Sequence, residues 1–134
     1  SQAQTVQVQL LSGPRMFIEK ELYQETIKLD NNFAAAYTFL GHTLWAWETV
    51  QVQLQLGPRT FNRKELYLEA IKLDNNFAFA YTNLGKALSS KETVQVQLQT
   101  VIRTFNKKEL FLEAIRLDNN YALAYTNLGA LLSP

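Results

Sequence analysis

Histidine, cysteine and paired carboxylates are the side chains that most often carry catalysis, and this chain offers few of them. His42 is the only histidine and cysteine is absent, so one chain cannot build a catalytic triad, a histidine pair or a thiolate metal site. Glu65, Glu69 and Asp74 recur in every copy of a repeated pattern together with lysines, as is typical of a solvated helix face with ion pairs. We therefore expect a protein that is not an enzyme and that uses no cofactor and no metal.

Charge and hydropathy exclude two further classes of partner. The 134 residues carry 13 basic and 12 acidic side chains, whereas binding to nucleic acid or to an anionic membrane needs clustered, uncompensated lysine and arginine. No apolar run approaches the roughly 18 residues of a membrane span, and nothing resembles a signal peptide. We expect a soluble protein, cytoplasmic rather than secreted, with no nucleic-acid or membrane partner. Since the chain starts at Ser1 without a methionine, we expect a processed chain or an excerpt.

An internal repeat organises the whole chain. The phrase Thr-Val-Gln-Val-Gln-Leu opens at Thr5, Thr49 and Thr93, at a spacing of 44 residues. Self-similarity on this scale predicts stacked supersecondary units. We therefore treat 1–134 as a single repeat array with repeat 1 at 5–48, repeat 2 at 49–92 and repeat 3 at 93–134.

Each repeat begins with a pattern typical of a β-hairpin. In repeat 2, valine or leucine alternates with glutamine over 50–55, which is the period of a strand with one buried face. Gly57 and Pro58 predict a turn, and 59–61 predicts a short returning strand. A hairpin is therefore expected at the start of every repeat.

Two helices are expected after the hairpin. Asn62 with Glu65 three positions later predicts a capped N-terminus, and apolar residues at helical spacing then predict a helix over 63–73. Residues 74–76 break this pattern, and a second apolar periodicity predicts a helix over 77–89.

One set of aromatic, small and leucine positions recurs in the helices of all three repeats. In repeat 2 it comprises Tyr67, Ala70, Tyr81, Leu84, Gly85 and Leu88. This set resembles the tetratricopeptide repeat, a family of paired antiparallel helices. The resemblance implies a mostly α fold, a helical repeat array or α-solenoid with a short β-hairpin in each of three repeats. It also implies a concave groove that binds peptides.

Two departures from that family are visible. The repeat has 44 residues rather than about 34, and the additional residues coincide with the hairpin. Asn31, Asn75 and Asn119 stand where the family has a proline. The chain therefore resembles a 44-residue tetratricopeptide-like variant with an inserted β-hairpin.

Residue types that change between repeats while the framework is retained indicate surfaces that the framework does not need. On the second helix of each repeat they form a stripe of Ala35, Phe39, His42, Trp45, Phe79, Asn83, Lys86, Leu123, Asn127 and Ala130. Helical spacing places each set on one face. The resemblance implies that this face binds a protein or peptide, with Phe39, Trp45 and Phe79 as aromatic anchors. The alternative is a core stripe that packs on the next helix.

The best-known groove of that family holds a ligand's terminal carboxylate between lysine, arginine and asparagine side chains. Asn83 and Asn127 match its asparagines, but Lys86 is the only cation on the stripe. A ligand is therefore expected to bind through apolar contacts.

Repeat 1 and the C-terminal end carry a second set of apolar residues. The set is Met16, Ile18, Trp47, Leu131 and Leu132. The first three stand where repeat 2 has threonine, asparagine and lysine. Ile18 therefore lacks the side-chain N-cap of Asn62, which contributes about 1 kcal/mol to helix stability. Large exposed apolar sets mark interfaces, which predicts self-association. The alternative is that the hairpin and helices of repeat 1 bury these side chains.

The first helix of repeat 1 also differs from its equivalents. Gln24 and Thr26 replace a leucine and an alanine of the other repeats. This replacement predicts an end cap on a helix whose outer face has no neighbour.

These patterns predict a non-enzymatic scaffold that binds a protein or peptide on its concave helix face. The alternative is a structural or engineered repeat protein that self-assembles into homo-oligomers through repeat 1 and the uncapped C-terminal helix. Uniform copies with localised apolar replacements suit either design or recent duplication.

Overall fold

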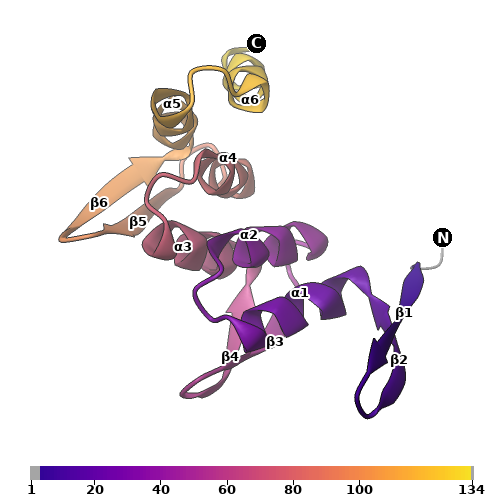
Figure 1. The fold of residues 1–134 in the computed structure, drawn as a ribbon. Helices are drawn as coiled ribbons and strands as arrows, with labels where there is room; N and C mark the ends of the chain where they lie inside the picture. The colour runs from indigo at the N-terminus through magenta and orange to yellow at the C-terminus, as the bar shows by residue number, and fades with distance from the viewer. Residues whose placement is uncertain (1–3, 134) are drawn as a thin grey trace.

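The computed structural model describes residues 4–133 and shows three copies of one unit, a β-hairpin followed by two helices (Figure 1). Repeat 1 contains β1 Thr5–Leu10, β2 Gly13–Ile18, α1 Glu19–Leu29 and α2 Ala34–Thr43. Repeat 2 contains β3 Thr49–Leu54, β4 Gly57–Asn62, α3 Arg63–Leu73 and α4 Ala78–Ala87. Repeat 3 contains β5 Thr93–Leu98, β6 Val101–Asn106, α5 Lys107–Leu117 and α6 Ala122–Leu132. No helix within this part of the chain combines the length and the apolar character needed to cross a bilayer.

The expected mostly α fold, an α-solenoid decorated with hairpins, is wrong. Strands occupy 28% of the described residues against 49% for helices, so the fold is mixed α/β. The physical reason is that the hairpins belong to the core. Val52, Val96, Phe61 and Phe105 are strand residues, and all four are buried. The second and third hairpins pack between the helices of consecutive repeats and are not appended to a finished helical array.

The hairpins are antiparallel pairs whose inward face is set by residue alternation. In repeat 2, Val50 pairs with Phe61, and the glutamines of β3 lie on the exposed face. Only Gln55 and Leu56 lie between the strands, so the predicted turn at Gly57 and Pro58 is misplaced by two residues. Gly57 instead begins β4 with a φ of +124°, a conformation that glycine adopts without strain.

The first helix of repeat 2 has the predicted bounds and cap. Asn62 Oδ1 accepts from Glu65 N at 2.9 Å, and Glu65 Oε1 accepts from Asn62 N at 2.8 Å. In repeat 1 only the second of these bonds is present, because Ile18 offers no side-chain acceptor and keeps the bond from its N to Glu21 Oε1 at 3.0 Å. The second helix, α4, is shorter than predicted, since Phe77 is its N-cap and Leu88 its C-cap.

The equivalent asparagines Asn31 and Asn75 tie repeats 1 and 2 to the next hairpin. Asn75 Nδ2 donates to Ile71 O at 2.6 Å, and its Oδ1 accepts from Gln99 N at 2.8 Å. The buried Tyr81 hydroxyl donates to Asn75 O at 2.8 Å. Repeat 1 makes the same set of bonds through Asn31. A proline could neither donate nor accept through its side chain, so asparagine suits a repeat that contains a hairpin.

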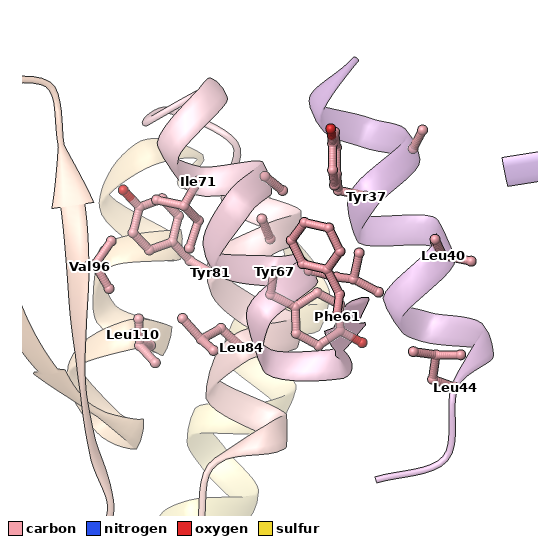
Figure 2. Packing of buried hydrophobic residues seen from close by; sticks show 14 of the residues in the cluster. Tyr37, Leu40, Leu44, Phe61, Tyr67, Ile71, Tyr81, Leu84, Val96 and Leu110 are labelled. Atoms are coloured by element: carbon pink, nitrogen blue, oxygen red, sulfur yellow. The ribbon is translucent and has the colours of Figure 1, made fainter. Parts of the chain in front are cut away.

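The main contact between repeats is an aromatic ring on a helical glycine. Helix α2 packs on α3, and α4 packs on α5. A methyl group at Gly41 would lie 2.7 Å from Cε1 of Tyr67, and one at Gly85 would lie 2.6 Å from Cε1 of Phe111. Figure 2 shows Tyr67 with Phe61 beside the helix that carries Tyr37, Leu40 and Leu44. The small residues allow the ring to fill the space between two helix backbones.

We predict that Gly85→Ala lowers the free energy of unfolding by about 1 to 3 kcal/mol, because the Phe111 ring must move. The matched control is Gly129→Ala in the equivalent position of α6, where an added methyl meets nothing within 4 Å among the described residues. That variant should gain about 0.5 to 1 kcal/mol from helix propensity. Urea unfolding of both variants at low protein concentration measures the difference. Equal effects of the two substitutions would contradict the contact.

We also predict that stability falls as the pH rises from about 10 to 12. Burial, and then the nearby Glu113 carboxylate, raises the pKa of Tyr81 from 10.0 to about 12. The unfolded state therefore ionises first, and the stabilisation present below pH 10 is lost above it. Tyr81→Phe should cost about 1 kcal/mol at neutral pH and make this loss shallower. Measuring the thermal unfolding temperature as a function of pH tests this prediction. Tyr125→Phe is the control, because the ring of Tyr125 is exposed and its substitution should have a small effect.

Candidate functional site

A cleft of about 520 Å³ opens between α2, the start of α4 and the turn before α6. Its lining residues are Phe39, Asn76, Phe77, Ala78, Phe79, Asp118 and Tyr121. Phe39 comes from α2, the next four residues from the turn and start of α4, and the last two from the turn before α6. The cleft thus exists only because the repeats stack in this order.

A row of aromatic rings forms one side of the cleft. The ring centroids of Phe39 and Phe79 are 5.7 Å apart, and those of Phe79 and Phe77 are 6.0 Å apart. Tyr23 of α1 extends the row, with its centroid 5.6 Å from that of Phe39. Phe39 is 40% exposed, so the row presents apolar surface to solvent. Rings at these distances support one another and offer a rigid contact surface.

The polar side chains that line the cleft are negatively charged or neutral. Asp118 Oδ1 accepts from Asn120 N at 3.0 Å, which holds the carboxylate at the end of α5. Burial, and then the nearby Asp118, raises the pKa of Tyr121. The residues that line the cleft include Asn76 but no lysine or arginine. This arrangement favours a ligand that brings an apolar side chain next to a positive charge.

The predicted groove stripe does not form one surface. Phe39 and Phe79 line the cleft, as just described, whereas Asn83 is buried between helices. Its Nδ2 donates to Phe79 O at 2.8 Å, and its Oδ1 lies 3.4 Å from Nδ1 of the exposed His42. Asn83 is therefore engaged within the protein and is not available to a ligand carboxylate.

The remaining stripe residues lie elsewhere. Lys86, Asn127 and Ala130 line a second hollow of about 380 Å³ together with Lys107, Phe111 and Leu131. Trp45 is 68% exposed and lies outside both hollows, as do the exposed Leu123 and the partly buried Ala35. The stripe separates because its members are spread along the helix axis, since Phe79 and Lys86 are seven positions or about 10 Å apart. Trp45 lies beyond the end of α2 at Thr43. Opposite ends of the helices therefore contribute to different hollows.

Sequence reasoning missed five residues of the cleft, which are Asn76, Phe77, Ala78, Asp118 and Tyr121. Asn76 and Asp118 belong to turns that we interpreted only as helix breakers, and Phe77 was assigned to helix packing. Tyr121 is the equivalent of Phe77 in repeat 3. The available signal was an aromatic residue directly before the second helix in every repeat, at 33, 77 and 121.

The predicted self-association residues are exposed in part but are not contiguous. Met16, Trp47 and Leu132 are exposed, whereas Ile18 and Leu131 are partly buried. The hairpin of repeat 1 and α6 lie at opposite ends of the molecule (Figure 1). One chain therefore cannot combine these residues into a single patch.

The end-cap prediction is wrong for Gln24, and for Thr26 it stays a prediction. Gln24 Nε2 donates to Gln51 O at 2.8 Å, so this side chain faces the hairpin of repeat 2 and not an open end. Thr26 Oγ1 donates to Leu22 O within its own helix.

Comparison with family models gives no match, and comparison with curated proteins gives none either. The tetratricopeptide resemblance therefore depends on the residues quoted for it. Among the described residues there is also no cluster of three or more histidine, aspartate or glutamate side chains that could hold a metal ion.

Proposed function

We propose that the protein is a non-enzymatic scaffold that binds a segment of another protein in the cleft between its repeats. The segment supplies an apolar side chain, flanked by lysine or arginine, and no reaction follows binding. The observation that supports this proposal is the aromatic row, to which α2 and α4 each contribute an exposed or partly exposed phenylalanine. Exposed apolar surface of this kind, bordered by polar groups, is typical of a protein interaction site.

Apolar burial supplies the affinity in this proposal. A leucine-sized or phenylalanine-sized side chain gains about 1.5 to 3 kcal/mol when it is fully buried. The cleft is open, so a single anchor gives weak binding, and contacts along the aromatic row must add to it. The proposed ligand is therefore an extended segment with more than one apolar residue.

The rim charge supplies orientation. Asp118 is an exposed carboxylate at the edge of the cleft, and no cation lines the cleft among the described residues. A lysine or arginine beside the anchor would approach this carboxylate and fix the direction of the bound segment. A ligand that depends on its terminal carboxylate is disfavoured, because Asn83 is engaged internally.

We predict that peptides selected from a random phage-displayed library contain an aromatic or branched apolar anchor. Their binding should fall at least about tenfold for Phe79→Ala, since one wall of the cleft is removed. Phe33→Ala is the matched control, because Phe33 is an exposed aromatic residue outside the cleft. Titration calorimetry with the selected peptides measures the change. A library without binders, or equal loss in both variants, would contradict the proposal.

We further predict that the selected peptides carry a basic residue next to the anchor. Asp118→Asn should weaken their binding about threefold to tenfold at low salt and remove most of its salt dependence. The same calorimetric titrations, repeated at increasing sodium chloride, provide the test. Peptides whose affinity is independent of Asp118 and of salt would show that the rim charge has no role.

A further inference from the structure

The contact between consecutive repeats is built twice from the same residues, and each of its two halves recurs unpaired at one end of the chain. One half is the pair of helices of one repeat with the turn between them, and the other half is the hairpin and first helix that follow, because α1 packs on β3 and α2 packs on α3. Within the chain the paired residues are Gly41 with Tyr67, Gly85 with Phe111, Tyr37 with Phe61, and Tyr81 with Phe105. In each of the two tyrosine–phenylalanine pairs the ring centroids are 6.1 Å apart.

The C-terminal end presents the first half without a partner. Tyr125 of α6 is 50% exposed, whereas its equivalents Tyr37 and Tyr81 are each 1% exposed. Leu132 is 68% exposed, although its equivalent Leu88 is buried. Around Gly129 an added methyl meets nothing within 4 Å in the part of the chain that the structure describes. The space that receives a ring in the other repeats is therefore open.

The turn before α6 is unpaired in the same way. Asn119 Nδ2 donates to Ile115 O at 2.8 Å, as its equivalents do within their own repeats. The equivalents also accept a bond from the next hairpin, at Gln55 N and Gln99 N. Within residues 4–133, Asn119 has no such second bond. Its counterpart in a hairpin of repeat 1 would be the backbone N of Leu11.

Within the described residues, the N-terminal hairpin and α1 present the second half without a partner. A hollow of about 330 Å³ is lined by Gln4, Thr5, Val6, Phe17, Glu19, Leu22 and Tyr23. The equivalents of Val6, Leu22 and Tyr23 in repeat 2 are all buried, and α2 packs on the helix that carries the last two of them. Val6 itself is 48% exposed, against 7% for Val50. The hollow is thus the seat that a preceding second helix fills in repeats 2 and 3.

We propose that a second copy of this chain fills this seat, with its α6 on α1 and on the hairpin of repeat 1. Tyr23 of one copy would rest on Gly129 of the other, and Asn119 would bond to the hairpin at Leu11. The argument for a second copy is continuity, because both halves belong to this chain and their complementarity is shown twice within it. The two halves lie at opposite ends of the molecule (Figure 1). Such a contact is heterologous and produces open chains of subunits.

Two substitutions at the N-terminal end weaken this contact relative to the internal ones. Lys107 Nζ donates to Gly85 O and Leu88 O, each at 2.9 Å, and so neutralises the carbonyl end of α4. The equivalent residue in repeat 1 is Glu19, whose carboxylate would face the carbonyl end of α6 with the wrong charge. Thr26 also replaces a small alanine that is buried in the other repeats. The association is therefore weaker than repeat packing and depends on concentration.

Sedimentation velocity over a concentration series up to about 1 mM tests the proposal. The average mass of the wild type should rise with concentration and not stop at a dimer. Gly129→Ala should weaken association at least about tenfold, because its methyl occupies the space for the Tyr23 ring. Glu19→Lys should strengthen association about tenfold or more, because it restores the cation of the internal contact. Since Gly129→Ala is expected to stabilise the monomer, weaker association cannot result from unfolding.

Matched controls separate this face from the other apolar surfaces. Met16→Ser changes the opposite face of the same hairpin, where Met16 pairs with Gln7 and not with Val6. Phe79→Ala changes the cleft proposed to bind peptides. Both variants should associate like the wild type, which also distinguishes failure of this proposal from failure of the proposed function.

A mixing experiment tests the direction of the contact. Gly129→Ala blocks the C-terminal half and Tyr23→Ala removes the N-terminal ring, so each variant alone should be largely monomeric. Their mixture should form a one-to-one dimer that does not grow, because each variant retains the half that the other lacks. A wild type and a Glu19→Lys variant that are both monomeric at about 1 mM would overturn the proposal. So would a mixture that associates no more than its separate components.

Discussion

The aromatic ring that rests on a helical glycine is the contact on which the rest of the structure depends. The helices have 10 or 11 residues, a length at which an isolated helix is marginal in water. Their stability therefore comes from packing, and the closest packing is at Gly41 and Gly85, where a ring from the next repeat fills the space of a missing side chain. A larger residue at these positions would force the ring to move and would loosen the contact between the two helices.

The hairpins take part in this packing because of their alternation and because of one asparagine per junction. Valine and phenylalanine on one face of each hairpin enter the core, and glutamine remains outside. Asn31 and Asn75 then bond to the backbone of the next hairpin, which sets its position relative to the preceding helices. The hairpin thus acts as a structural layer between repeats, and this explains why a helical array with appended hairpins is the wrong description.

Stacking has two further consequences. It brings the middle of α2, the start of α4 and the turn before α6 together, which creates the aromatic cleft between Phe39, Phe79 and Tyr121. It also leaves one unmatched half of the repeat contact at each end of the chain. Tyr23 borders both surfaces, but Phe79 lines the cleft alone and Gly129 lies at the C-terminal end alone, so substitution at these two positions separates binding of another protein from association of copies. Glu19 shows how a single charge on an otherwise repeated surface can modulate one of them.

Local features were predictable from the sequence. The bounds of α3, its Asn62 cap, the existence of a hairpin in each repeat and the 44-residue period all follow from spacing within a few residues or from direct repetition. The exposure of Phe39 and Trp45 also agrees with the view that residues that differ between repeats lie outside the framework. These features depend on backbone preferences and on side-chain periodicity, which a single chain segment carries by itself.

Other features were decided only by tertiary structure. The core position of the hairpins, the burial of Asn83, the contact of Gln24 with β3 and the meeting of Phe77 with Tyr121 in one cleft all require segments from different repeats or elements. Helical periodicity places a residue on a face of its helix, but it does not specify which neighbour covers that face. The contacts between glycines and aromatic rings orient one repeat on the next and so determine that neighbour. This orientation cannot be read from the spacing of residues in the sequence.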